Sequence, residues 1–124
     1  MSAYISIDQI PPSVNHYVKH TRTGRHYMTG EAQAFKDALA YEVRDRHENG
    51  NRFNVTMTIT LGKGEKGDID NFPKLVLDGL AACGMFRDMK GKRVSDARVL
   101  RLEVCVNDLD RPDRGQTEVW VRGY

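Results

Sequence analysis

The residues with the clearest chemical potential stand together at positions 67–74, in the run Gly-Asp-Ile-Asp-Asn-Phe-Pro-Lys. Asp68 and Asp70 are two positions apart, so both carboxylates project to the same side of an extended backbone. Two like charges held this close require a cation between them, or one of them must stay protonated. Mg²⁺ binds carboxylate oxygens and keeps positions for water and substrate phosphate. The pair therefore predicts a Mg²⁺ site, and the alternative is a solvated turn in which Asp70 or Asn71 caps a helix.

A helix is expected directly after the acidic pair. Apolar residues recur at steps of three and four over residues 71–83, Pro73 falls in the first turn, and Gly84 suits the position just past the end. Lys74 would then lie one turn above Asp70 on the same face of the helix. A lysine there can neutralise phosphate charge beside a metal ion, or it can form an ordinary ion pair with the aspartate.

Length and composition limit the class of protein. The 124 residues suffice for one domain with a single modest core, and a net charge of +2 with 29% charged residues is ordinary for a soluble protein. No apolar run approaches the roughly 18 residues of a membrane helix, and no signal peptide is evident. We therefore expect one domain over residues 1–124, in the cytoplasm and without a membrane partner. Cys83 and Cys105 lack neighbours at zinc-ligand spacing and are interpreted as reduced core thiols.

A basic segment rich in histidine and tyrosine follows the rigid turn at Pro11 and Pro12. Its cationic side chains can contact a phosphate backbone, and its tyrosines can stack against bases. The alternative interpretation is a solvated hairpin, because Thr23 and Gly24 mark a turn in its middle. The candidate DNA contacts in this segment are His16, Tyr17, Lys19, His20, Arg22 and Arg25.

Periodic patterns predict the elements around these residues. A helix is expected from Thr29, with a buried stripe formed by Ala32, Phe35, Leu39 and Val43. Alternating apolar residues predict strands at residues 3–7, 53–61, 97–107 and 116–122. In the third strand, Leu100, Leu102 and Val104 are expected on one face, and Arg101 and Glu103 on the other.

This order of elements indicates an α+β fold, with two helices packed on one face of a small mixed β-sheet. The chemical candidates would then gather at one end of that sheet. The acidic pair would lie at a strand-to-helix junction, and Asp96 would lie at the start of the next strand.

Several blocks of sequence occur in a diagnostic order over most of the chain. They are Pro11-Pro12-Ser13-Val14-Asn15, Glu31-Ala32-Gln33-Ala34-Phe35-Lys36-Asp37, Asp68-Ile69-Asp70-Asn71-Phe72-Pro73-Lys74 with Asp78 and Gly84 downstream, and Asp96-Ala97-Arg98-Val99. This arrangement resembles the RusA family of Holliday-junction resolvases, which are small endodeoxyribonucleases often carried by phages and prophages. The resemblance implies a RusA-like fold and Mg²⁺-dependent cleavage of four-way DNA junctions by a homodimer during DNA recombination and repair, with Mn²⁺ as a substitute.

The resemblance also implies roles for individual residues. Asp68 and Asp70 would be catalytic metal ligands, and Lys74 would be the essential lysine. The family usually carries two adjacent aspartates before its next strand, whereas this chain has no such pair. Asp96 is favoured as the third catalytic carboxylate and metal ligand because it adjoins a strand, and Asp88 is the alternative.

The loop after the second helix adds further candidate DNA contacts, namely Lys90, Lys92 and Arg93. Two other functions remain open at this point. One is a non-catalytic module that binds DNA junctions and keeps the fold, because the aspartate pair is missing. The other is a structural or protein-interaction domain whose helix is simply capped at its start.

Overall fold

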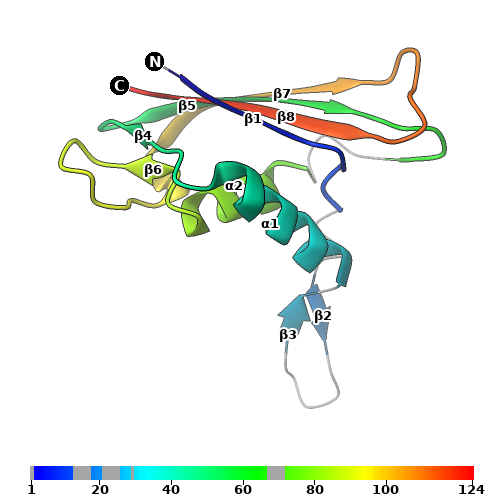
Figure 1. The fold of residues 1–124 in the computed structure, drawn as a ribbon, viewed down its shortest axis with the longest axis horizontal. Helices are drawn as coiled ribbons and strands as arrows, with labels where there is room; N and C mark the ends of the chain where they lie inside the picture. Colours follow the sequence, from blue (N-terminus) through cyan, green and yellow to red (C-terminus); the bar gives the residue numbers. More distant parts are fainter. Residues whose placement is uncertain (1, 13–17, 21–25, 29, 67–71) are drawn as a thin grey trace.

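The computed structural model describes residues 2–12, 18–20, 26–28, 30–66 and 72–124. Its main layer is a four-stranded sheet, and two helices cover one face of that sheet (Figure 1). The elements in chain order are β1 (Ser2–Ile7), β2 (Val18–His20), β3 (His26–Met28), α1 (Gly30–Val43), β4 (Glu48–Asn49), β5 (Phe53–Thr60), α2 (Pro73–Ala82), β6 (Phe86–Arg87), the short 3-10 helix η2 (Asp96–Arg98), β7 (Val99–Asn107) and β8 (Gln116–Gly123). The α+β class expected from the sequence is confirmed.

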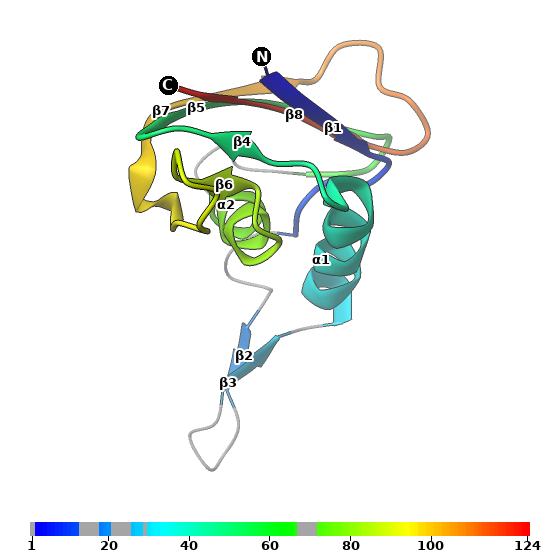
Figure 2. The same cartoon turned by 60° about the vertical axis from the view of Figure 1, so that its left-hand side comes forward.

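The sheet is mixed, as its order β1-β8-β5-β7 and strand directions show. β8 runs antiparallel to both of its neighbours, β1 and β5. β7 runs parallel to β5 and borders the sheet, so β7 and β8 follow one another in sequence without pairing. The short strands β4 and β6 form a separate parallel pair, and β2 and β3 form a hairpin that projects away from the sheet (Figure 2).

Alternation along β5 explains why this strand lies inside the sheet. Phe53, Val55, Met57 and Ile59 are buried on the face that the helices cover, and the polar residues between them are half-buried on the open face. β8 repeats the pattern, with Val119 and Val121 on the covered face. One apolar face in contact with the helices therefore holds the core together.

The helices contribute apolar stripes at helical spacing. In α1 the buried residues are the four expected from the sequence, Ala32, Phe35, Leu39 and Val43. In α2 they are Leu75, Val76, Gly79 and Leu80. A Cβ atom added at Gly79 would collide with Leu39 Cδ2, so the glycine allows the two helices to pack closely.

The end of α2 follows the sequence expectation. Cys83 is the C-cap, and Gly84 follows it with φ +77°, a left-handed conformation that glycine adopts without strain. The Gly84 amide donates to the Ala81 carbonyl, and the Met85 amide donates to the Leu80 carbonyl. This pair of bonds is the Schellman motif, which satisfies carbonyl groups at the end of a helix.

Several features of local structure differ from what was considered from the sequence. The N-cap of α2 is Phe72, without a side-chain hydrogen bond, so neither Asp70 nor Asn71 holds that position. The strand expected from Ala97 begins at Val99, because Ser95 accepts a hydrogen bond from the Ala97 amide and starts the 3-10 turn.

The apolar alternation expected along β7 fails at Leu100. The register with β5 shifts between Phe53 and Asn54, which places Val99 opposite Phe53 and leaves Leu100 as a bulge. Leu100 is therefore exposed instead of joining the core.

Both thiols are free in the part of the chain described, as expected, but they are not both buried. Cys83 is half-buried, and burial raises the pKa of its thiol. Cys105 is exposed, because it lies on the open face of the bordering strand β7. The N-cap expected at Thr29 lies outside the described residues. Among those residues, no helix is both long and apolar enough to cross a membrane.

Candidate active site

The first turn of α2 carries the lysine that the sequence singled out. Pro73 opens the helix, and the preceding Phe72 is buried against Ile59 and Leu61. This contact fixes the start of α2 beneath the end of the sheet where β5 finishes. Lys74 is exposed there, and it forms no ion pair with any residue that the structure describes. Within the described part of the chain, its ammonium group has no acidic partner.

The acidic pair, Asp68 and Asp70, lies outside the described residues, as does Asn71. The predicted metal ligands and the expected contact between Lys74 and Asp70 therefore stay predictions. The chain just before this segment is well anchored. Arg111 donates from Nη1 to the Gly62 carbonyl (3.1 Å) and to the Glu65 carbonyl (2.6 Å).

A second set of bonds strengthens this anchor. The Glu65 carboxylate accepts a hydrogen bond from the Gly62 amide at 2.6 Å, and the Lys63 amide donates to the Pro112 carbonyl at 2.8 Å. Arg111 is itself held by Asp108, with Nε 2.5 Å from the carboxylate. The loop between β7 and β8 thus fixes the loop that leads to the acidic segment. No pattern in the sequence indicated this positioning role for Arg111.

Asp96 lies in the first turn of η2, directly before β7. Its side chain is half-buried, and its carboxylate has no hydrogen bond or ion pair within the described part of the chain. The short helix packs against α2. The carboxylate is consequently held on a structured element while its oxygens remain open to a cation.

Asp88, the alternative carboxylate, is engaged differently. Its Oδ1 accepts hydrogen bonds from the backbone amides of Lys90 and Lys92, each at 2.9 Å. The Lys92 and Lys90 amides, together with the charge of Arg98, hold the pKa of Asp88 below its ordinary value. Asp88 therefore closes the turn of its own loop.

Lys74 and Asp96 do not lie at the same end of the sheet, contrary to the sequence expectation. Phe72 marks the end where β5 finishes, and Val106 of β7 packs against the same cluster. Asp96 precedes Val99, which pairs with Phe53 at the opposite end. Val99 and Val106 are about 23 Å apart, at about 3.3 Å per residue of strand. The physical reason is that β5 and β7 pair in parallel. The end of β5, which leads to Lys74, and the start of β7, which follows Asp96, therefore lie at opposite ends of the strands.

The basic residues occupy two separate parts of the surface. In the β2–β3 hairpin, Lys19 pairs with Tyr27 and His20 pairs with His26, which agrees with a hairpin at this position. This hairpin projects beyond the start of α1, whereas the loop after β6 lies at the other end of the helices (Figures 1 and 2). His16, Tyr17, Arg22 and Arg25 lie outside the described residues.

The loop after β6 presents its charges unequally. Lys90 and Lys92 are exposed, and neither forms an ion pair with an acidic residue that the structure describes. Arg93 instead donates to the Ala82 carbonyl at 3.4 Å, and its guanidinium covers Gly84. Arg93 therefore also completes the end of α2.

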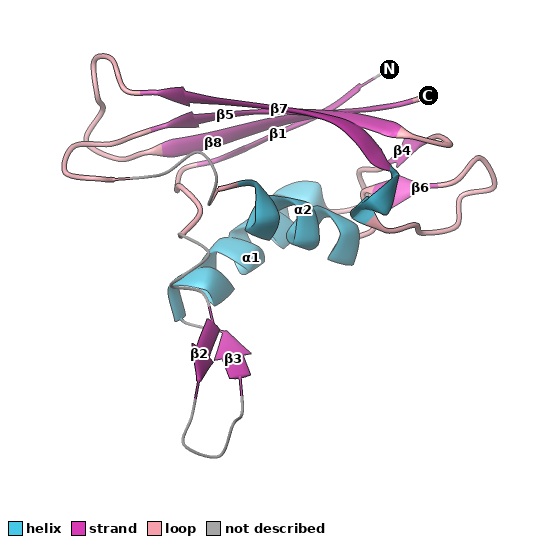
Figure 3. Cartoon of the chain, turned by 180° about the vertical axis from the view of Figure 1, so that it is seen from behind, coloured by secondary structure: helices cyan, strands magenta, loops and turns pink. Residues whose placement is uncertain are grey.

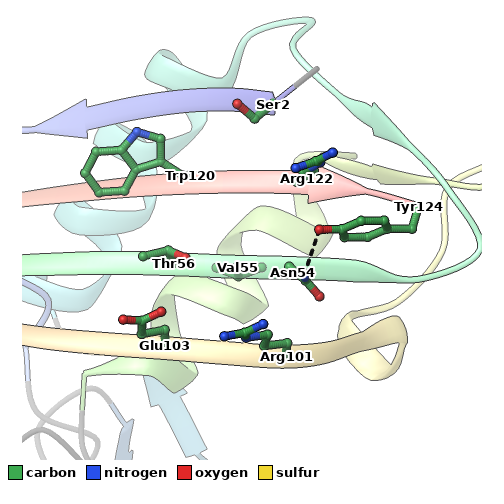
Figure 4. Close-up of a pocket in the computed structure, with 9 residues that line it drawn as sticks. All are labelled: Ser2, Asn54, Val55, Thr56, Arg101, Glu103, Trp120, Arg122 and Tyr124. Atoms are coloured by element: carbon green, nitrogen blue, oxygen red, sulfur yellow. Dashed lines mark hydrogen bonds between the residues drawn. The ribbon is translucent and has the colours of Figure 1, made fainter.

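A shallow hollow of about 320 Å³ lies on the open face of the sheet, away from all of these residues. Figure 4 shows the side chains that line it, which are Ser2, Asn54, Val55, Thr56, Arg101, Glu103, Trp120, Arg122 and Tyr124. Asn54 donates a hydrogen bond to the Tyr124 hydroxyl at 3.0 Å. None of the residues predicted from the sequence to bind metal or DNA lines this hollow.

Among the described residues, no three carboxylate, imidazole or thiol side chains form a group able to hold a metal ion. The two aspartates predicted to begin such a group are outside that set. No family model matches this sequence, and no curated protein matches it.

Proposed function

We propose that this protein is a Mg²⁺-dependent, structure-selective endonuclease of the RusA type, which cuts four-way DNA junctions as a cytoplasmic homodimer in DNA recombination and repair. The main support is the position of Lys74. It is an exposed cation in the first turn of α2, directly after the run that contains Asp68 and Asp70. Two carboxylates followed by an exposed lysine combine metal ligands with a group that neutralises phosphate charge.

The residues available suit Mg²⁺. The ion prefers hard oxygen ligands, and Asp68, Asp70 and Asp96 offer carboxylates only. Asp96 supports this assignment because its oxygens are open within the described structure, whereas Asp88 accepts two amide hydrogen bonds. Mn²⁺ has similar ligand preferences and is expected to substitute.

In a site that combines Lys74 and Asp96, we propose that the two groups come from different copies of the chain. The groups lie at opposite ends of the sheet in one copy, with about 23 Å of β7 between those ends. A two-fold dimer carries the Asp96 of one copy toward the Lys74 of the other. A junction that is cut symmetrically also needs two sites related by such an axis.

The chemistry is hydrolysis of a phosphodiester bond. When bound, Mg²⁺ activates the attacking water and neutralises charge on the phosphate. The aspartates hold the ion, and Lys74 stabilises the negative charge that develops on the phosphate and the leaving oxygen. Arg111 keeps the loop before the acidic segment in place, through its bonds to Gly62 and Glu65.

The basic segments position the DNA. His16, Tyr17, Lys19, His20, Arg22 and Arg25 of the hairpin segment and Lys90, Lys92 and Arg93 of the second loop are proposed to contact the strands. Contacts to phosphate carry no sequence information, and they weaken steeply with salt. We expect binding that depends on junction shape and on ionic strength.

Junction cleavage by two single variants tests the choice of the third carboxylate. Asp96→Asn should abolish nicking of a labelled four-way junction in Mg²⁺, because amide oxygens bind the ion more weakly. Asp88→Asn should retain most of the activity, since its role is to accept amide hydrogen bonds. Loss of activity in Asp88→Asn alone would show that the assignment to Asp96 is wrong.

A second candidate function is junction binding without cleavage. It is favoured by the absence of the adjacent aspartate pair and by the separation of Lys74 from Asp96 within one chain. Isothermal titration distinguishes the two functions. A nuclease should take up Mg²⁺ or Mn²⁺ and lose that uptake in Asp70→Asn, whereas a pure binding module should bind junctions without any such dependence.

A further inference from the structure

The bordering strand β7 leaves one edge of the sheet without a partner strand in the described structure. Its inner side pairs with β5 from Phe53 to Thr60, and no described strand follows on its outer side. Figure 3 shows β7 along the border of the sheet when the molecule is seen from behind. A strand of nine residues with a free row of amide and carbonyl groups is a template for pairing with another chain.

Three exposed leucines lie on this strand or just after it. Leu100 and Leu102 of β7 are 69% and 41% exposed, and Leu109 in the following turn is 78% exposed. All other leucines of the chain are buried or half-buried. Leu100 and Leu102 therefore add exposed apolar surface to the unpaired strand, a combination that favours pairing with another chain.

Symmetry and charge favour a second copy of the chain as the partner of β7, with Leu102 on the two-fold axis. When a strand pairs antiparallel with its own copy about a two-fold axis, one residue lies opposite itself. An axis beside Leu102 places Arg101 of each copy opposite Glu103 of the other. Axes beside Arg101 or Glu103 would instead place like charges opposite each other, which is unfavourable.

The open face presents the two charges in the required way. Arg101 and Glu103 both project from β7 at the border of the hollow in Figure 4, on the same face of the sheet. Neither forms an ion pair with another described residue. Arg101 of one copy and Glu103 of another would therefore complement each other across a pair of antiparallel strands.

We propose that β7 pairs antiparallel with β7 of a second copy, with Leu102 opposite its own counterpart and Arg101 opposite Glu103. This inference deepens the proposed function, because the expectation of a homodimer rests on that function. The geometry of the pairing is argued from β7 alone. It joins the four-stranded sheets of both copies into one. It also brings η2 of one copy to the end of the other copy's β7, where Val106 packs near the start of α2.

Charge reversal tests this register in the full-length chain. Arg101→Glu and Glu103→Arg should each weaken self-association about ten-fold or more in sedimentation equilibrium, because each places two pairs of like charges across the interface. The double variant and an equimolar mixture of the two single variants should both recover wild-type association, since opposite charges again face each other. Circular dichroism controls for folding.

The results that overturn the proposal are equally definite. They are a wild-type chain that stays monomeric at all accessible concentrations, single variants that associate as tightly as wild type, or a mixture that shows no recovery. Association is measured without DNA or Mg²⁺. A failure of the nuclease proposal therefore leaves this measurement unaffected, and a failure of the pairing leaves junction cleavage to be judged on its own.

Cysteine cross-linking gives an independent reading of the register. In a Cys105→Ser background, Leu102→Cys should form a disulfide-linked dimer under mild oxidation, because residues directly opposite on paired strands meet the geometry of a disulfide. Leu100→Cys is the matched control, since its two copies would lie about 13 Å apart along the strands. Cross-linking of Leu100→Cys without Leu102→Cys would contradict the proposed axis.

Discussion

Asp88 and Asp96 show how local contacts separate two carboxylates that stand close together in sequence. Asp88 accepts two amide hydrogen bonds and closes a turn, while Asp96 is held on η2 with its oxygens open in the described structure. A carboxylate that already stabilises its own backbone gains less from binding a cation. At the scale of single residues, the structure therefore supports different roles for the two aspartates.

The role of Asp88 predicts an effect on its own loop. Asp88→Ala should increase hydrogen exchange at the Lys90 and Lys92 amides, because both lose their acceptor. Asp88→Asn should preserve more protection, since the amide oxygen can still accept. Unchanged exchange at both amides in Asp88→Ala would contradict this role.

The same contact has a defined pH dependence. The folded-state pKa of Asp88 lies below its ordinary value, so the unfolded chain takes up a proton first as the pH falls. The stabilisation is complete above about pH 4, the range of an unperturbed aspartate. It is lost as the pH falls through the lowered pKa. Exchange at the Lys90 amide, corrected for intrinsic rates, should rise only on that acidic side.

Element ends depend on backbone conformation as much as on side chains. Gly84→Ala should lower the free energy of unfolding by about 1–2 kcal/mol, because φ +77° is strained for alanine. An added Cβ would also lie 2.6 Å from Arg93 Nε and displace the guanidinium that covers the end of α2. Urea denaturation followed by circular dichroism measures the loss.

Gly64→Ala is the matched control for that substitution. Gly64 also has φ +77°, but no heavy atom lies within 4 Å of its added Cβ. It should show the backbone strain without the displacement of Arg93, and hence a somewhat smaller loss. A Gly84→Ala protein as stable as wild type would show that the Schellman motif is not maintained at this position.

Most elements were predictable from periodicity. The buried stripe of α1, the alternation of β5 and the glycine after α2 all follow from the spacing of apolar residues and from one glycine. These features are local, so the sequence around each one carries the full signal. The bulge at Leu100 and the 3-10 turn at Asp96 were missed because each depends on pairing or capping that apolar spacing does not encode.

The arrangement of the candidate site was less predictable than its residues. The sequence marks Lys74 and Asp96, but their separation depends on whether β5 and β7 run parallel or antiparallel. That choice is made by packing across the whole sheet, in which β8 lies between β1 and β5 and runs antiparallel to both. Arg111 was also missed, because its bonds join loops that are far apart in sequence.

At the scale of the whole molecule, a site shared between copies predicts complementation. Asp70→Asn and Asp96→Asn should each be inactive alone, because every site in each homodimer lacks a ligand. A mixed dimer contains one site with both residues intact and one site with neither. Mixing the two proteins should therefore restore nicking to about a quarter of the wild-type rate on statistical grounds, because about half of the dimers are mixed and each has one intact site of two.

The dimers must exchange subunits completely for this comparison, so the two proteins are unfolded together and refolded before the assay. A mixture of wild type with the double variant Asp70→Asn/Asp96→Asn serves as the control, since it sets the activity of partly intact dimers. A mixture of the single variants with no activity would place Asp70 and Asp96 of the working site in the same copy.

The most direct test of the nuclease account is cleavage and binding of a four-way junction by wild type and Asp70→Asn, measured side by side in Mg²⁺. We expect wild type to nick the junction and Asp70→Asn to lose at least a hundred-fold in rate while its affinity for the junction in gel shift stays within about three-fold. Cleavage by Asp70→Asn at the wild-type rate, or no cleavage by wild type with Mg²⁺ or Mn²⁺, would contradict the account.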